Sequence, residues 1–282
     1  MIVVTGATGH LGSLVIKALL KKVPASGIVA TVRNGEKAKS IAALGVHIRN
    51  ADYNQPAMWD IALRGADKVL LISSSELGQR AKQHRSVIDA AKRAGVKFLA
   101  YTSILHADTS PLGLAVEHKA TEALIRASGV PFALLRHGWY TENYTAGIPG
   151  ALAQGAVYGC AGEGRIAAAA RADYAEADAA VLTAENQAGR VYELAGDAAF
   201  TLAEFAAEIS RQSGKKIGYV NMPEAEYKKV LVKAGLPEPV AALLSDSDAG
   251  VSKGGLFDDG HQLSKLIGRP TTSLAAAVKA AL

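Results

Sequence analysis

Nearly at its start, this chain of 282 residues carries the stretch Val3-Val4-Thr5-Gly6-Ala7-Thr8-Gly9-His10-Leu11-Gly12. A β-branched run leads into three glycines, and a helical pattern follows at residues 11–22. We expect Gly6 to permit a tight turn, Gly9 to let a ligand approach the backbone, and Gly12 to allow close packing of helix on strand. The free N–H groups and the positive end of the helix dipole would then face a pyrophosphate, as in dinucleotide-binding folds.

The rest of the first half alternates short apolar runs with amphipathic segments. Strands are expected at residues 2–5, 27–32, 46–49, 68–72, 98–102 and 131–135, and helices at 11–22, 36–44, 56–63, 80–94 and 115–127. This alternation predicts an α/β fold of Rossmann type, in which helices cover both faces of a doubly wound parallel sheet.

The second half has longer helical patterns and fewer strands. Its expected helices lie at residues 201–213, 224–234 and 240–244, with a short strand at 217–220. Thr201 would cap the first of these helices, with Glu204 completing a capping box. Residues 245–260 are rich in Asp, Ser and Gly, and we expect a mobile loop there. The chain is thus expected to divide into a cofactor-binding Rossmann domain at 1–136 and a smaller C-terminal α/β lobe at 137–282, which would bind the substrate and could return some segments to the sheet.

The second expected strand ends at Arg33 instead of at an acidic residue. Folds that prefer NAD usually place Asp or Glu about 20 residues beyond the glycines to bind the ribose 2′-hydroxyl. No acid stands between residues 30 and 34. A guanidinium suits a 2′-phosphate, so the sequence predicts NADPH as the cofactor and NADH as a weaker one. A plain surface arginine is the alternative.

Two further segments would end at the same edge of the sheet. Asp52 follows the third strand, where it would either accept a hydrogen bond from the adenine amino group or cap the helix beginning near Pro56; the sequence favours neither. Ser73, Ser74 and Ser75 follow the fourth strand. Their hydroxyl and backbone groups would contact the cofactor there, with an ordinary polar loop as the alternative.

The fifth and sixth strands should end near the nicotinamide of a dinucleotide stretched across the sheet. Tyr101 lies at the end of the fifth, and the sixth leads into His137-Gly138-Trp139-Tyr140-Thr141-Glu142. Trp139 and Tyr140 would either wall an aromatic substrate pocket or pack between the lobes, and we favour the pocket. Tyr101 and His137 are further candidates for the pocket or for proton supply.

A motif common in enzymes of this fold is missing. None of the nine tyrosines is followed four residues later by a lysine, the partner that lowers a tyrosine pKa for alcohol oxidation. Proton removal from a secondary alcohol therefore lacks support, whereas hydride transfer to a quinone needs little help with protonation. No catalytic residue can be assigned on this basis. The histidines at 106, 118 and 137 are candidate proton donors, with a structural role as the alternative.

Composition excludes several classes of protein. At 49% hydrophobic and 20% charged residues, the chain is ordinary for a globular protein. Its net charge of +5 comes from interleaved basic and acidic residues with no Lys/Arg run longer than two, which argues against nucleic-acid binding. Cys160 is the only cysteine, so we expect an inert thiol and no metal site. No signal peptide or membrane-spanning run is apparent, which predicts a cytoplasmic protein without membrane insertion; the oligomeric state stays open.

Several segments resemble the NmrA-like atypical short-chain dehydrogenases, and among them the bacterial NAD(P)H:quinone oxidoreductases. The similar segments are the glycine turn and residues 32–34, 72–75, 101–103, 138–143, 252–257 and 263–272. The resemblance implies NADPH bound by the Gly6–Leu11 turn, Arg33, the Ser73–Ser75 loop, the His137–Glu142 stretch and Arg165. It also implies a quinone reduced over the nicotinamide without a dedicated catalytic tetrad.

The resemblance leaves two points open. His137 stands where members of the family carry asparagine, so its role does not follow from the likeness. The family also includes triphenylmethane-dye reductases and non-catalytic NADP(H) sensors that act through a protein partner. An enzyme acting on another extended π-system, or a redox sensor, are therefore the alternatives to a quinone reductase.

Overall fold

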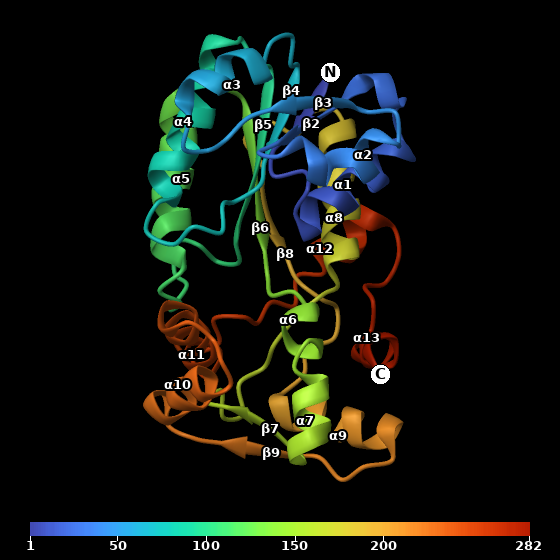
Figure 1. Ribbon diagram of the computed structural model, residues 1–282, viewed down its shortest axis with the longest axis vertical. Helices are drawn as coiled ribbons and strands as arrows, with labels where there is room; N and C mark the ends of the chain where they lie inside the picture. The colour runs from blue at the N-terminus through green and yellow to red at the C-terminus, as the bar shows by residue number, and fades with distance from the viewer. The chain divides into compact units, whose positions relative to one another are not determined.

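The computed structural model in Figure 1 describes the backbone of residues 1–282 and every side chain except that of Lys37. The contacts divide the chain into two compact units. Unit 1 comprises Met1–Ile104, Glu117–His137 and Arg171–Tyr192, and unit 2 comprises Leu105–Val116, Gly138–Ala170 and Glu193–Leu282. Each unit collects segments that are separate in the sequence. The cofactor and substrate roles expected for residues 1–136 and 137–282 stay predictions.

A seven-stranded sheet has the strand order β3-β2-β1-β4-β5-β6-β8. Its strands are β1 (Ile2–Val4), β2 (Ile28–Val32), β3 (His47–Asn50), β4 (Lys68–Leu71), β5 (Phe98–Ile104), β6 (Phe132–His137) and β8 (Val191–Leu194). The pairs from β3 through β6 are parallel. The direction of strand addition reverses between β1 and β4, and ligands of open α/β sheets bind outside the carboxyl ends of the strands at such a point. The expected Rossmann-type fold is confirmed.

Helices cover both faces of this sheet. They are α1 (His10–Leu20), α2 (Lys39–Ala42), α3 (Pro56–Ala62), α4 (Arg80–Arg93), α5 (Ala115–Ser128) and α8 (Arg171–Thr183), with short 3-10 turns at Ala25–Gly27 and Gly35–Ala38. Helix α1 packs on α8, and α3 packs on α4. Figure 1 shows these two pairs on opposite sides of the strands.

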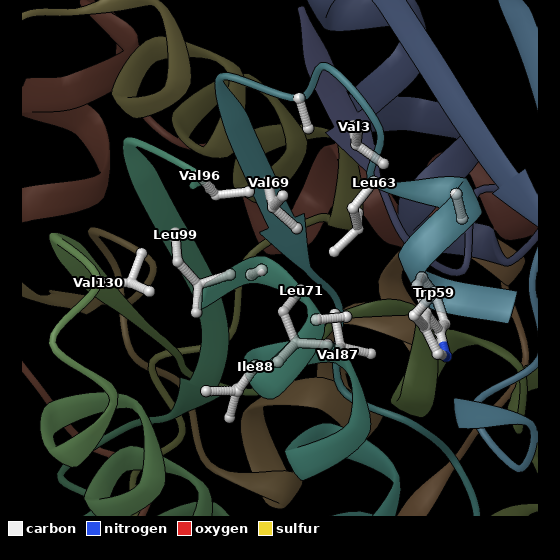
Figure 2. Packing of buried hydrophobic residues seen from close by; sticks show 14 of the residues in the cluster. Val3, Trp59, Leu63, Val69, Leu71, Val87, Ile88, Val96, Leu99 and Val130 are labelled. Carbon is white, nitrogen blue, oxygen red and sulfur yellow. The ribbon is translucent and has the colours of Figure 1, made fainter. Parts of the chain in front are cut away.

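Aliphatic side chains of three strands form the core on the α3–α4 face. Figure 2 shows Val3, Val69 and Leu99 in one cluster with Trp59 of α3 and Val87 of α4. Each of these side chains is at most 1% exposed. Burying a side chain of this size contributes about 1.5–3 kcal/mol, so the core holds the strands, and with them their carboxyl ends, in fixed positions.

Unit 2 contains the remaining helices and a two-stranded parallel sheet of β7 (Ala156–Gly159) and β9 (Gly218–Asn221). The helices are α6 (Glu142–Thr145), α7 (Ile148–Gln154), α9 (Leu202–Ser213), α10 (Glu224–Lys233), α11 (Glu238–Val251), α12 (Gln262–Ile267) and α13 (Leu274–Ala281). The expected capping box of Thr201 and Glu204 at the start of α9 is confirmed. No helix among the described residues is both long enough and apolar enough to cross a membrane.

The expectation of a mobile loop at residues 245–260 is wrong for the first half of that range. Helix α11 continues to Val251, and Ser245 and Ser247 are buried within it. Their hydroxyls donate to Ala242 O and Leu243 O, at 3.1 and 2.8 Å, on the preceding turn of the helix. A serine hydroxyl can therefore be hydrogen-bonded to a backbone carbonyl inside a helix, so a polar composition alone does not end the helix.

Candidate functional site

The glycine turn joins β1 to α1, as expected. Gly6 has a φ of +58°, a backbone conformation that residues with a side chain rarely adopt. A Cβ atom on Gly12 would lie 2.7 Å from Ala7 Cα, so α1 packs on the turn at a distance that only glycine allows. The predicted strand, turn and helix are therefore all present in the conformation that a dinucleotide-binding motif requires.

The start of α1 fits a phosphate group. Thr8, Gly9 and His10 are exposed, the N-cap residue Gly9 makes no side-chain cap, and the first turn carries no acidic residue. The first backbone N–H groups of a helix lack partners within it, and the helix dipole favours an anion beside them. Gly9 N–H donates to Gly6 O at 2.9 Å, and the N–H groups that follow it at the start of α1 could hold the pyrophosphate of a dinucleotide.

Arg33 follows β2 directly, and its side chain is 64% exposed. Its Nη1 atom lies 3.2 Å from Glu76 Oε1 in the segment after β4. An exposed guanidinium at this end of the second strand fits a 2′-phosphate, which supports the expected preference for NADPH. The sequence-based interpretation missed Glu76, although an acid shortly after the Ser73–Ser75 segment could have drawn attention to it.

Asp52 does not cap the helix that follows it. Its Oδ1 atom accepts a hydrogen bond of 2.8 Å from the Asn54 backbone N–H, while Gln55 is the N-cap of α3 and makes no side-chain cap. The capping alternative is therefore wrong. The other alternative, a contact between Asp52 and adenine, stays a prediction.

The three serines after β4 lie in different environments. Ser74 is buried, its hydroxyl donates to Gln83 Oε1, and its backbone N–H donates to His84 Nε2 at 2.9 Å. Ser73 is partly buried, with its backbone N–H bonded to Thr102, whereas Ser75 is exposed. Ser74 therefore holds the loop in place from within, which leaves Ser73 and Ser75 better placed for contact with a cofactor.

The hydrogen bonds of His84 define its tautomer. Because Nε2 accepts from Ser74 N, the proton must be on Nδ1, which lies 2.9 Å from Thr121 Oγ1. The Thr121 hydroxyl in turn donates to Glu117 O at 2.9 Å. Burial, and next the positive charge of Arg80, lower the pKa of His84 to about 3. His84 is thus a neutral acceptor that fixes the serine loop.

Tyr101 lies in the core of unit 1. Its side chain is fully buried, and its hydroxyl is 2.8 Å from His118 Nδ1. Burial raises the pKa of Tyr101 above its ordinary value and lowers that of His118 well below its own. A buried hydroxyl with a raised pKa does not line a substrate pocket, so the structure argues against the roles expected for Tyr101. The same burial argues against His118 as a proton donor.

His137 also has structural partners. Its Nε2 atom lies 2.9 Å from Asp178 Oδ1, and its ring stacks on Tyr174 with centroids 4.6 Å apart. Both the histidine and the aspartate are buried. These contacts tie the end of β6 to α8 within unit 1. A direct role for the His137 side chain in binding the cofactor stays a prediction that these contacts do not favour.

The remaining expected residues belong to unit 2. Trp139 and Tyr140 are partly buried, and their strand-like segment pairs with Ala169. Glu142 is the first residue of α6, and Arg165 is exposed with Nη2 bonded to Ala199 O. In contrast, the glycine turn, Arg33 and the serine loop all follow neighbouring strands of one sheet in unit 1. The structure thus assembles the adenosine and phosphate end of the expected site from β1, β2 and β4.

Comparison with known proteins agrees with this geometry. A model of the NmrA-like family matches residues 1–275. The chain belongs to the NmrA-like family. Two curated relatives match 99% of the chain and 97% of their own length: Quinone oxidoreductase 2 of Escherichia coli, 59% identical over 278 residues, and NAD(P)H azoreductase of Xenophilus azovorans, 28% identical over 282 residues.

Two solved structures show the same fold as this NmrA-like chain. An NADPH-dependent quinone oxidoreductase from Escherichia coli, complexed with NADPH, has a TM-score of 0.98 and 58% identity, with 99% of each chain covered. Citrobacter sp. triphenylmethane reductase, complexed with NADP(H), has a TM-score of 0.96 and 41% identity, with 100% of each chain covered. The resemblance expected from the sequence is confirmed.

Proposed function

We propose that this protein is an NADPH-dependent quinone reductase that transfers a hydride directly from the nicotinamide to a bound quinone. The observation that carries the proposal is the 59% identity, over 99% of the chain, to Quinone oxidoreductase 2 of Escherichia coli. The glycine turn, the uncapped start of α1 and the exposed guanidinium of Arg33 support the choice of cofactor.

The residues of unit 1 bind and orient the cofactor in this proposal. The start of α1 would hold the pyrophosphate, Arg33 would hold the 2′-phosphate, and Ser73 and Ser75 would also contact the cofactor. NADPH supplies the hydride, which brings two electrons and one proton to the quinone. Trp139 and Tyr140 of unit 2 remain the predicted contacts of the quinone.

One more proton completes the hydroquinone, and solvent is its proposed source. Tyr101 and His118 are buried and hydrogen-bonded to each other, and their pKa values are shifted away from neutrality. Neither is therefore suited to exchange a proton during turnover. Hydride transfer leaves the reduced quinone with one phenolate oxygen on an aromatic ring, and this oxygen can take its proton from water.

Replacing Arg33 with alanine tests the cofactor assignment. A charge-assisted hydrogen bond contributes about 1.5–3 kcal/mol, so KM for NADPH should rise about 10- to 150-fold, and KM for NADH should change much less. The measurement is the loss of reduced-cofactor absorbance with benzoquinones and naphthoquinones as acceptors. Arg93→Ala is the control, because Arg93 is also an exposed arginine of unit 1 paired with a carboxylate, Asp60. Equal changes for both cofactors would show that Arg33 does not bind the 2′-phosphate.

A second acceptor class is favoured by the likeness to Citrobacter sp. triphenylmethane reductase, which is 41% identical over the full length. Triphenylmethane dyes are extended π-systems that accept a hydride at carbon. Like quinones, they can be reduced without a tyrosine that donates a proton. Parallel turnover measurements with a quinone and a cationic dye separate the two classes. If the dye oxidises NADPH faster than the quinone does, the dye replaces the quinone as the proposed substrate.

A further inference from the structure

The guanidinium assigned to the 2′-phosphate is already paired with a carboxylate. Arg33 Nη1 lies 3.2 Å from Glu76 Oε1, and the two side chains are 64% and 40% exposed. An incoming phosphate would therefore meet a negative charge beside its own binding group. This pairing concerns the proposed cofactor site directly, and neither residue is needed for the core of unit 1.

The Glu76 carboxylate is held by donors other than Arg33. Its Oε2 atom accepts hydrogen bonds from Gln83 Nε2 at 2.6 Å and from Asn54 Nδ2 at 3.2 Å. Its backbone N–H donates to Ser74 Oγ at 3.1 Å, and Gln83 is itself buried. If Arg33 turns toward a ligand, these bonds keep the carboxylate where it is. Glu76 is thus a fixed negative charge, whereas Arg33 is the exposed partner that can move.

The sheet topology explains why the two residues meet. Strands β2 and β4 are the two neighbours of β1, Arg33 follows β2, and Glu76 follows β4. The pair therefore joins the segments on either side of the carboxyl end of β1, where the glycine turn begins. A ribose whose 2′-substituent contacts Arg33 has the Glu76 carboxylate within reach.

We propose that Glu76 limits the preference of this site for NADPH by two effects that act in the same direction. It competes with the 2′-phosphate of NADPH for Arg33 and repels that phosphate, and it accepts a hydrogen bond from the 2′-hydroxyl of NADH. In NAD-specific folds an acid at the end of the second strand performs the second task. Here the acid comes from the segment after the fourth strand. The inference rests on the proposed function only in placing the cofactor at the glycine turn.

Substituting Glu76→Gln removes the charge and keeps the size of the side chain. Calorimetric titration with NADP+ and with NAD+, without any quinone, measures both affinities. We expect the Kd for NADP+ to fall about 2- to 5-fold, as for the release of an exposed ion pair. The Kd for NAD+ should rise about 2- to 10-fold, because a neutral amide replaces the carboxylate acceptor. The preference for NADP+ should therefore increase by about 4- to 50-fold.

Asp60→Asn is the matched control. Asp60 is an exposed carboxylate of unit 1 that is paired with Arg93 at 2.7 Å, so its substitution removes the same charge from the same kind of pair. It should leave the ratio of the two Kd values unchanged. An unchanged ratio in Glu76→Gln, or the same shift in Asp60→Asn, overturns the proposed role of Glu76.

The design separates this inference from the proposed function. Binding is measured without an acceptor, so a shifted ratio in Glu76→Gln supports the inference even where no quinone is reduced, and the missing turnover then counts against the reductase alone. Conversely, rapid quinone reduction with an unchanged ratio refutes the role of Glu76 and leaves the reductase standing. If neither nucleotide binds the unsubstituted protein, both are wrong.

Discussion

Replacing His84 with glutamine should make the protein lose less stability on mild acidification. His84 is fully buried, accepts a hydrogen bond from Ser74 N and lies beside Thr121 Oγ1. Burial and the nearby charge of Arg80 lower its pKa to about 3. A protonated ring would lose its acceptor and leave the Ser74 N–H without a partner. Folding therefore holds this histidine neutral, and glutamine can still accept a hydrogen bond without taking up a proton.

The sign follows from the direction of the shift. An unfolded histidine has a pKa of about 6.5, so below that pH the unfolded chain takes up a proton that folded His84 refuses. Its contribution is fully present above the unfolded pKa and is lost as the pH falls toward the folded value of about 3. Between about pH 7.5 and 5.5 the loss amounts to roughly 1.4 kcal/mol for one histidine. Buried His118, whose pKa is also lowered, adds a loss in the same direction.

Urea unfolding of the two proteins at both pH values measures the effect. The decrease in the free energy of unfolding should be smaller in His84→Gln than in the unsubstituted chain, by roughly 1.4 kcal/mol. Comparing the variants cancels other groups, including Asp248, whose pKa burial raises. His47→Gln is the control, because His47 is exposed on β3. An equal decrease in His84→Gln and the unsubstituted chain would refute the account of His84 as a buried neutral acceptor.

Two further substitutions test the packing behind the site. Glu122→Ala removes a buried carboxylate that pairs with buried Arg136, whose Nη2 lies 2.7 Å from Glu122 Oε2. It should lower the free energy of unfolding by about 3–5 kcal/mol; urea unfolding measures this, and a loss below about 1 kcal/mol would contradict it. Gly12→Ala should weaken NADP+ binding at least about 10-fold in calorimetry, since its Cβ would lie 2.7 Å from Ala7 Cα and α1 must shift, whereas Gly27→Ala, with open space around it, should not.

The first half of the fold could be predicted because its signals are local. Most strands there are short apolar runs followed by a helix, although β3 is largely polar. The expected ranges of the six strands differ from the observed bounds of β1 to β6 by only a few residues. Helix α8 gave no such signal. It is rich in alanine and buried on most sides, including Asp173 and Asp178, so it lacks the single apolar stripe of an amphipathic helix. Its place in unit 1 depends on contacts with α1, distant in the sequence.

The residues of the candidate site show the same difference between local signals and contacts that are distant in the sequence. The glycine turn and Arg33 could be identified from the sequence because their expected roles follow from the adjacent strand and helix. Glu76 was missed, because its importance arises from a partner 43 residues away in the sequence. Tyr101 was misjudged for a related reason: a residue at the end of a strand can face the core or the ligand. The burial of both faces of β5 leaves no alternation in the sequence to tell the two apart.

The position of Tyr101 bears on the chemistry open to this chain. A tyrosine that serves as an acid or base needs a pKa lowered toward neutrality and contact with the substrate. Here burial raises the pKa of Tyr101, and its hydroxyl bonds to His118 in the core. Reducing a simple ketone would leave a strongly basic alkoxide, and the buried Tyr101 is not placed to protonate it. Reducing a quinone leaves a phenolate-like oxygen, which the aromatic ring stabilises and water can protonate. The inward-facing tyrosine is therefore compatible with an acceptor that becomes aromatic on reduction.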